Sequence, residues 1–235
     1  MDQTSIRERL IDAAFDLVVE EGFEAVDAPA VAGRAGVDVR HFHAGFAGPV
    51  DCIVAGLIAA NDSAFEAARD FEPEDTVREK LFELVMARLD RLSERREAIA
   101  RLRWTALRTP LLAAALAWEL DRALALMLDQ AGAGAGGPAG ALRRTGFLTT
   151  VYAPVVEAWL KDDSDDLAHT MAELDKRLDR AERMARRLPF NRDAADDMPG
   201  PDAGPAAPPD DLAADGPADG LGPTTPPPAP KAPPA

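Results

Sequence analysis

The amino-acid sequence predicts an all-α fold with a small three-helix N-terminal domain, a larger helical body and a disordered C-terminal tail. Apolar residues recur at three- and four-residue spacing through most of the first 188 positions, as in amphipathic helices. No alternating apolar–polar run is long enough to predict a strand. From Pro189 onward the chain is rich in Pro, Ala, Gly and Asp, a composition that cannot bury enough apolar surface to fold. The predicted boundaries are therefore 1–47, 48–188 and 189–235.

The N-terminal segment predicts short helices in tight succession. Ser5 and Glu8 match a capping box at the start of the first helix, and Gly22 suits the position just beyond its end. Asp27 is the predicted N-cap of a second helix, which ends near Ala35. The apolar residues of both helices share one face, so we expect the two helices to pack on a common core.

A glycine turn leads from the second helix to the third. Gly36 supplies the left-handed residue of the turn, and Asp38 is the predicted N-cap of the third helix. Phe42 and Phe46, four residues apart, are expected to anchor that helix in the core. A helix-turn-helix of this form places its second helix where it can enter the major groove of DNA. The residues left for the outer face of this helix are Val39, Arg40, His41, His43 and Ala44.

Three stretches of the segment follow a known pattern without a gap: DAAFDLVVEEGFEA, then V-A-x-R-A-G-V at residues 31–37, then a closing Phe46. In these stretches residues 6–53 resemble the N-terminal domain of the tetracycline-repressor (TetR) family. The resemblance implies a dimeric regulator of transcription, a repressor that leaves its DNA operator when a small apolar effector binds. The residues assigned to DNA contact are Asp27, Arg34, Asp38, Val39, Arg40, His41 and His43.

The chain departs from the family pattern at the expected DNA face. His43, Ala44 and Gly45 stand where the family has an aromatic run, and Pro49 stands where it often has a phosphate-contacting lysine. Residues 1–47 contain four arginines and nine acidic residues, although Lys and Arg normally supply much of the affinity for DNA. The alternative hypothesis is therefore a TetR-like ligand-sensing or protein-interaction module that has weakened or lost DNA binding.

The two arginines of the predicted helix-turn-helix have different expected roles. The guanidinium of Arg40 matches the O6 and N7 acceptors of guanine, but it is also placed to pair with Asp38 or with a phosphate. Arg34 is expected to pair with an acidic neighbour rather than with DNA. His41 and His43 are two residues apart and do not share a helix face, so we predict no metal site.

The body is predicted to contain six helices, with the glycine-rich segment 131–140 as a connector that no helix crosses. Their predicted ranges are 48–70, 75–92, 94–108, 110–131, 140–162 and 164–188. The last two carry apolar stripes and, by the resemblance, are expected to form the homodimer as a four-helix bundle.

Aromatic and apolar residues of these helices offer enough surface to line an effector pocket. The predicted lining residues are Trp104, Arg108, Trp118, Met127, Phe147, Val151 and Tyr152. Arg103 and Glu119 are further candidates for orienting a polar end of the ligand. The alternative is that the aromatic residues belong to an ordinary helical core.

The remaining features exclude several classes of function. The net charge of −15 argues against a generally basic nucleic-acid coat. A single cysteine, Cys52, is typical of a reducing compartment, and no signal peptide or membrane span is predicted, so we expect a cytoplasmic protein. No nucleophile–base arrangement or phosphate-binding loop stands out. We therefore predict no catalytic residue, no cofactor and no enzyme activity.

Overall fold

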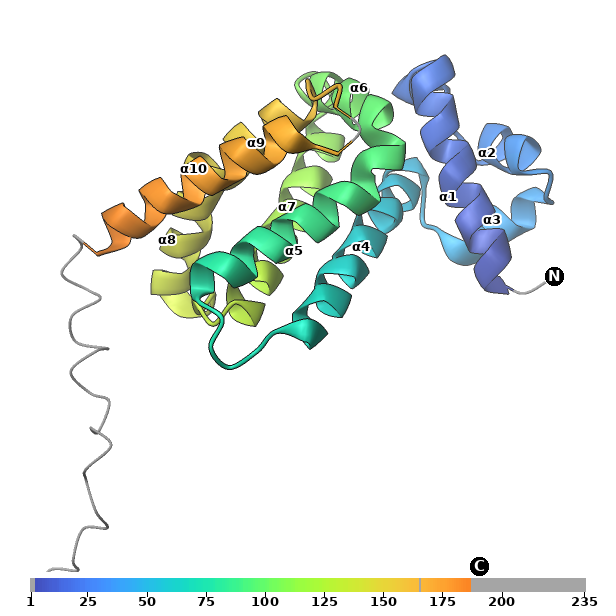
Figure 1. Ribbon diagram of the computed structural model, residues 1–235. Coiled ribbons are helices and arrows are strands. Elements are labelled where there is room, and N and C mark those ends of the chain that lie inside the picture. The colour runs from blue at the N-terminus through green and yellow to red at the C-terminus, as the bar shows by residue number, and fades with distance from the viewer. Residues whose placement is uncertain (1–2, 165, 187–235) are drawn as a thin grey trace, which may run out of the picture. The chain divides into compact units, whose positions relative to one another are not determined.

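The computed structural model describes residues 3–164 and 166–186, and the tail predicted from residue 189 lies outside these ranges. The described residues form helices joined by short turns, with no strand among them (Figure 1). The α-helices are α1 (Gln3–Glu20), α2 (Ala28–Ala35), α3 (Val39–Gly45), α4 (Pro49–Ala67), α5 (Val77–Leu92), α6 (Arg96–Ala106), α7 (Pro110–Gln130), α8 (Gly137–Phe147), α9 (Ala153–Trp159) and α10 (Ala168–Ala185). Single turns of 3-10 helix are η1 (Phe23–Ala25), η2 (Ala68–Asp70) and η3 (Ser93–Arg95), and η4 (Leu148–Tyr152) is a π-helical turn.

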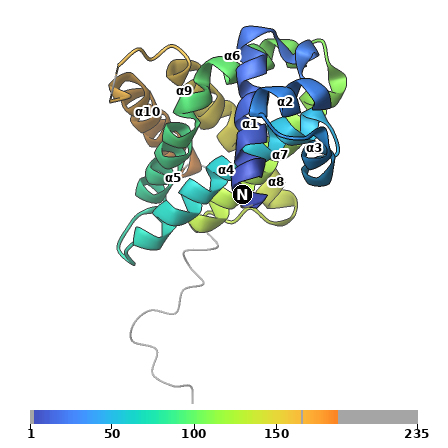
Figure 2. The same ribbon diagram turned by 90° about the vertical axis from the view of Figure 1, so that its right-hand side faces the viewer.

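Helices α1, α2 and α3 form the N-terminal head (Figure 2). The prediction that Ser5 caps α1 is wrong, because the helix already begins at Gln3 and Ser5 lies in its first turn. Gln3 and Thr4 are not helix breakers, so the helix extends past the expected cap. The head core contains the apolar residues that the helical spacing indicated, with Leu10, Ala14 and Val18 almost fully buried.

Helix α4 connects the head to the body. Pro49 occupies its first turn, where a missing backbone N–H costs nothing. Near its middle, Gly56 allows α1 to approach closely: a Cβ atom at this position would lie 2.4 Å from Cε2 of Phe15 and 2.7 Å from Cγ2 of Ile11. Arg95 strengthens the contact by donating to the Gly56 carbonyl at 2.9 Å and to Asp12 Oδ1 at 2.7 Å.

In the body, α4 packs against both α5 and α7, and α10 packs against α5 and α9. The glycine-rich connector is shorter than predicted, because α8 begins at Gly137 rather than at residue 140. Pro138 lies in the first turn of α8, where proline favours a helix start. The predicted single helix over 140–162 is divided into α8, η4 and α9.

A proline explains this division. Pro154 has no N–H to donate to the carbonyl of Thr150, and its ring would clash with that carbonyl in a regular α-helix. The helix widens into the π turn η4 just before this point. The turn leaves Val151 and Tyr152 pointing into the body, where both are buried.

Helix α10 begins at Ala168, four residues later than predicted, because the side chain of Asp162 organises the preceding loop. Asp162 accepts hydrogen bonds from Ser164 N at 3.1 Å and Ser164 Oγ at 2.5 Å, and from Thr170 N at 2.7 Å and Thr170 Oγ1 at 2.6 Å. Leu174 and Leu178, from the apolar stripe expected at the dimer contact, are buried within the protomer instead.

Candidate functional site

The turn between α2 and α3 has the geometry that the sequence predicts. Asp27 Oδ1 accepts from Ala30 N at 2.8 Å and caps α2, and Asp38 Oδ1 accepts from Arg40 N at 2.9 Å and caps α3. Gly36 has φ 63° and ψ 39°, the left-handed conformation that favours glycine. These local bonds define where each short helix begins and how the chain turns between them.

Helix α3 is held in place from its inner side. Phe42 and Phe46 are buried, and their ring centroids lie 5.5 Å apart. From α1, Arg7 Nη1 donates to the Gly45 carbonyl at 2.8 Å, and its guanidinium lies 4.4 Å from the centroid of the Phe46 ring. A second arginine of α1, Arg9, donates to the carbonyl of Ala35 at the end of α2.

The outer face of α3 carries Val39, Arg40, His43 and Ala44, all exposed. The side chain of Arg40 is 78% exposed, and its Nε lies 3.8 Å from Asp38 Oδ2, so this pairing leaves it accessible. His41 is half-buried and differs from the rest of the predicted set. It faces α1 across a hollow of about 430 Å³ that Arg7 also lines.

Arg34 does not project from the same face. It pairs with Glu20 of α1 and lies 3.7 Å from Asp16, as expected for an arginine with acidic neighbours. The hydrogen bond with Glu20 raises the pKa of Arg34, and the same bond lowers the pKa of Glu20. Three of the four arginines in the head are therefore engaged within it: Arg7, Arg9 and Arg34.

The body contains a buried polar cluster drawn from four of its elements. Arg88 of α5 and Glu119 of α7 form its ion pair, with side-chain exposures of 4% and 3%. Arg88 Nη2 donates to both carboxylate oxygens, at 3.0 and 3.2 Å, and its Nε donates to Asn61 Oδ1 of α4 at 2.9 Å. Its Nη1 donates to the hydroxyl of Tyr152 in η4.

Burial and charge act in opposite directions on this cluster. Burial disfavours the charged form of Arg88, but Tyr152 and Glu119 outweigh it and hold the pKa of Arg88 above its ordinary value. Burial raises the pKa of Tyr152 despite the nearby guanidinium, so its phenol stays neutral. The cluster thus carries one positive and one negative charge in the core.

The sequence itself contains a signal for this ion pair. Arg88 lies on the apolar stripe of α5, between Val85 and Leu92 at helical spacing. Glu119 lies in the same way on α7, seven residues after Leu112. Opposite charges on the inner stripes of two helices predict a buried pair. To anchor the polar end of a ligand, Glu119 would have to share or exchange its ion pair with Arg88.

The seven predicted effector residues fall into two groups. Met127, Phe147, Val151 and Tyr152 are buried in the body. Trp104, Arg108 and Trp118 are exposed, the two indoles by 64% and 55%, because they face away from the core on α6, α7 and the turn between them. The structure therefore does not place all seven around one interior pocket.

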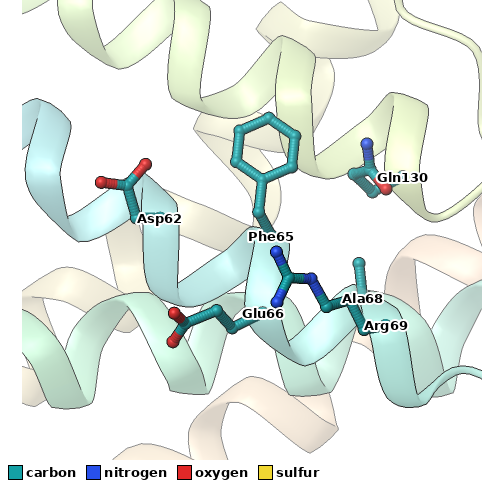
Figure 3. A pocket seen from close by; sticks show the side chains of 6 residues that line it. All are labelled: Asp62, Phe65, Glu66, Ala68, Arg69 and Gln130. Atoms are coloured by element: carbon teal, nitrogen blue, oxygen red, sulfur yellow. The ribbon is translucent and has the colours of Figure 1, made fainter.

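A surface hollow of about 620 Å³ lies where the ends of α4 and α7 meet, and none of the seven lines it. Figure 3 shows the ring of Phe65 with the charged side chains of Asp62, Glu66 and Arg69 around this hollow. Within the described ranges, no group of three or more His, Cys, Asp or Glu side chains is arranged to hold a metal ion.

An exposed short helix presented by a capped turn, joined by α4 to a helical body, is a helix-turn-helix arrangement. The particular fold is that of the TetR transcriptional regulators. The chain is similar to a TetR transcriptional regulator from Nitrosomonas europaea, with a TM-score of 0.61 and 21% identity over 77% of this chain and 98% of that one. It is also similar to the fatty acid degradation regulator FadR from Bacillus halodurans, with a TM-score of 0.54 and 19% identity over 74% and 93% of the two chains.

No family model matches the sequence, and no curated protein matches it. Among residues 3–164 and 166–186, no single helix is long and apolar enough to cross a membrane. Only α3 together with α4 and η2 would meet that requirement, and a bend of 65° separates them.

Proposed function

We propose that the chain is a DNA-binding repressor of transcription of the TetR type, active in the cytoplasm and released from its operator by a small apolar effector. Residues 1–47 would bind DNA, and residues 48–188 would bind the effector and a second copy of the chain. The observation that carries the proposal is the exposed outer face of α3, with Arg40 and His43 projecting from a helix that Phe42 anchors.

Arg40 is the best candidate for reading a base. Its guanidinium is exposed and its backbone is fixed by the Asp38 cap, so the side chain extends from a rigid element. Val39 and His43 would contact the groove beside it, whereas His41 faces α1. Asp27, Arg34 and Asp38 would position the two helices. A bidentate Arg–guanine contact contributes about 1–3 kcal/mol of discrimination.

The buried cluster supports a route from the effector to DNA. Asn61 belongs to α4, the helix that carries the head, and it bonds to both Arg88 and Glu119. An effector that enters among Met127, Phe147, Val151 and Tyr152 would press on the same cluster through Tyr152. Movement of α4 would then change the separation of the two recognition helices in a dimer, which must match one turn of DNA, about 34–36 Å.

A homodimer through the last helices of the body completes this proposal. The free face of α8, η4 and α9 carries the exposed residues Thr145, Thr149 and Ala153. Small residues of this kind let two helices approach closely. The exposed face of α10 is charged, which suits the rim of an interface better than its centre.

The direct test is binding of the full chain to DNA from its own upstream region. We expect a gel shift with steep salt dependence, and Arg40→Ala should weaken specific binding about 5- to 150-fold. Arg91→Ala, at an exposed arginine of α5, is the matched control and should bind like the wild type. Equal binding by Arg40→Ala and the wild type would show that α3 does not read the bases.

The alternative is a ligand-sensing or protein-interaction module that no longer binds DNA. One observation favours it: Arg7, Arg9 and Arg34 are engaged inside the head, so phosphate binding would depend largely on Arg40 and on backbone N–H groups. Absence of any shift at low salt would support this alternative over the repressor.

A further inference from the structure

The hollow of about 430 Å³ in the head lies between the first turns of α1 and the end of α3, two helices that pack against each other (Figure 2). We call it the head hollow, and its volume is within the range of pockets that bind small molecules. Two of its lining residues, Ala44 and Gly45, have no side-chain atoms beyond Cβ, which leaves this space open. None of its lining residues belongs to the effector site proposed for the body.

One part of the head hollow is apolar. Leu10 and Phe46 are 1% and 4% exposed and belong to the head core, and Ile6 is partly buried against that core. A ligand with a carbon skeleton would cover this surface and remove it from water, which favours binding. A phosphate of DNA or a free inorganic anion has no apolar part and would leave the same surface in contact with water.

The other part of the head hollow contains a cation, Arg7. Its Nη1 donates to the Gly45 carbonyl and its guanidinium lies on the Phe46 ring, so the charge is held at the edge of the hollow. The hydrogen bond uses one of the five N–H donors of the guanidinium. Arg34 and Arg40 each pair with a carboxylate of the head, whereas Arg7 has no ion pair with any residue that the structure describes. An anion in the hollow would supply that missing charge.

Two further polar side chains line the same space, Thr4 of α1 and His41 of α3. Neither side chain forms a hydrogen bond with another residue in the described ranges. A hydroxyl and an imidazole can each donate one hydrogen bond in their neutral forms. A carboxylate beside Arg7 could therefore accept from both helices, and its bonds from the guanidinium would be the stronger, charge-assisted ones.

We infer that the head hollow binds a small aromatic carboxylate, with the carboxylate beside Arg7 and the ring against Ile6 and Phe46. An aromatic ring suits this place because it can pack edge-to-face or offset on the ring of Phe46. The ligand would join α1 to α3 on the side of α3 that faces α1, away from the exposed face that carries Arg40. It differs in chemistry and place from the apolar effector proposed for the body, and its binding does not depend on that effector or on DNA.

The test is isothermal titration calorimetry of the full chain with 2-naphthoate, which is ionised at neutral pH. For a ligand of about 13 non-hydrogen atoms we expect a dissociation constant between about 10 µM and 1 mM. Two probes separate the parts of the site: 2-naphthamide keeps the rings without the charge, and inorganic phosphate keeps charge without rings. Each should bind at least about 10-fold more weakly than 2-naphthoate. Equal binding by either probe, or no binding of 2-naphthoate at millimolar concentration, overturns the inference.

A variant that fills the head hollow tests the location. A Cβ atom at Gly45 would lie 3.7 Å from Arg7 Nη1, an ordinary van der Waals contact, so a side chain can be placed there without overlap. Gly45→Phe should raise the dissociation constant for 2-naphthoate at least about 10-fold, because the new ring takes the place of the ligand. Gly33→Phe, on α2 outside the hollow, is the matched control, since its Cβ would meet nothing within 4 Å. Undiminished binding by Gly45→Phe overturns the assigned location.

Arg7→Met tests the charge while keeping most of the side-chain volume. The wild type should prefer 2-naphthoate to 2-naphthamide by at least about 10-fold, and Arg7→Met should reduce this preference to about 2-fold or less. A general loosening of the head would weaken both ligands and leave their ratio unchanged. An unchanged ratio therefore overturns the role assigned to Arg7.

A readout on the wild type needs no substitution, because the three histidines of the chain lie in different places. His41 lines the hollow, His43 is on the outer face of α3, and His169 is on α10. In nuclear magnetic resonance spectra, 2-naphthoate should shift the imidazole C–H signals of His41 most and leave those of His169 unchanged. This pattern supports the inference even if a variant fails to fold, and any other order of shifts overturns it.

Discussion

Two arginine–carboxylate pairs, one in the head and one in the body, show how burial changes the role of the same chemistry. Arg34 and Glu20 join α2 to α1 at the surface, where water and salt screen their attraction. Arg88 and Glu119 join α5 to α7 in the core, with almost no exposed area. The exposed pair can open without disturbing the core, whereas the buried pair can change partners only if the body rearranges.

Breaking the buried pair should have the largest effect. Glu119→Leu leaves the Arg88 charge buried with only Asn61 and Tyr152 as partners, so we expect a loss of about 3–5 kcal/mol in the free energy of unfolding. Urea denaturation followed by circular dichroism measures it.

The double variant Arg88→Met/Glu119→Leu is the control, because it removes both charges and keeps similar volume. It should recover most of the loss and come within about 1 kcal/mol of the wild type. If Glu119→Leu alone has the same urea midpoint of unfolding as the wild type, the pair is not buried in solution. The contrast between the buried and the exposed pair would then be wrong.

The Asp162 loop offers a pH-dependent test in the body. Burial acts to raise the pKa of Asp162, but the hydrogen bonds from Ser164 and Thr170 outweigh it and hold the pKa below its usual value. Because the folded pKa is the lower one, the stabilisation is present above the unfolded value of about 3.9 and is lost as pH falls through the folded value.

Asp162→Asn should therefore lower the free energy of unfolding by about 1–3 kcal/mol at pH 7. The difference between the variant and the wild type should shrink as the pH falls below about 4. Thermal melts at several pH values measure it. Asp163→Asn, at the neighbouring exposed position, is the control for the change in charge. A difference that does not depend on pH would contradict the assigned cause.

Local capping in the head should give a smaller effect. Asp27→Ala removes the acceptor for Ala30 N and should lower the free energy of unfolding by about 1 kcal/mol. Asp27→Asn retains a side-chain oxygen and should lower it much less. Chemical denaturation distinguishes them. Equal losses would indicate that charge, rather than the cap, stabilises the start of α2.

The exposed pair should have the smallest effect. Glu20→Gln weakens the ion pair with Arg34 at the surface, so we expect the melting temperature to fall by no more than about 3 °C. Glu21→Gln removes the same charge without a hydrogen bond to Arg34, and an equal fall from it would mean that net charge alone is responsible.

Local rules predicted the head more accurately than the body. Asp27, Gly36 and Asp38 were each assigned a role from chemistry within a few residues, and each has that role in the structure. Arg7 and Arg9 were not assigned, because their acceptors on α2 and α3 lie 26 or more residues away in sequence. Contacts of that kind depend on how helices meet, which periodicity does not specify.

The body shows the same limit on a larger scale. The helices were predicted, but which aromatic residues face inward was not: Trp159 is buried, whereas Trp104 and Trp118 are exposed. A helix with apolar residues on several faces does not reveal which face meets its neighbours. The division of the predicted helix 140–162 at Pro154 follows from the proline, but the widened turn depends on the packing around Tyr152.

The contact at Gly56 has a mechanical consequence. Since a Cβ atom there would overlap the side chains of Phe15 and Ile11, a larger residue would push α1 away from α4. The seating of the head on the first half of α4 therefore depends on this one hydrogen-sized position.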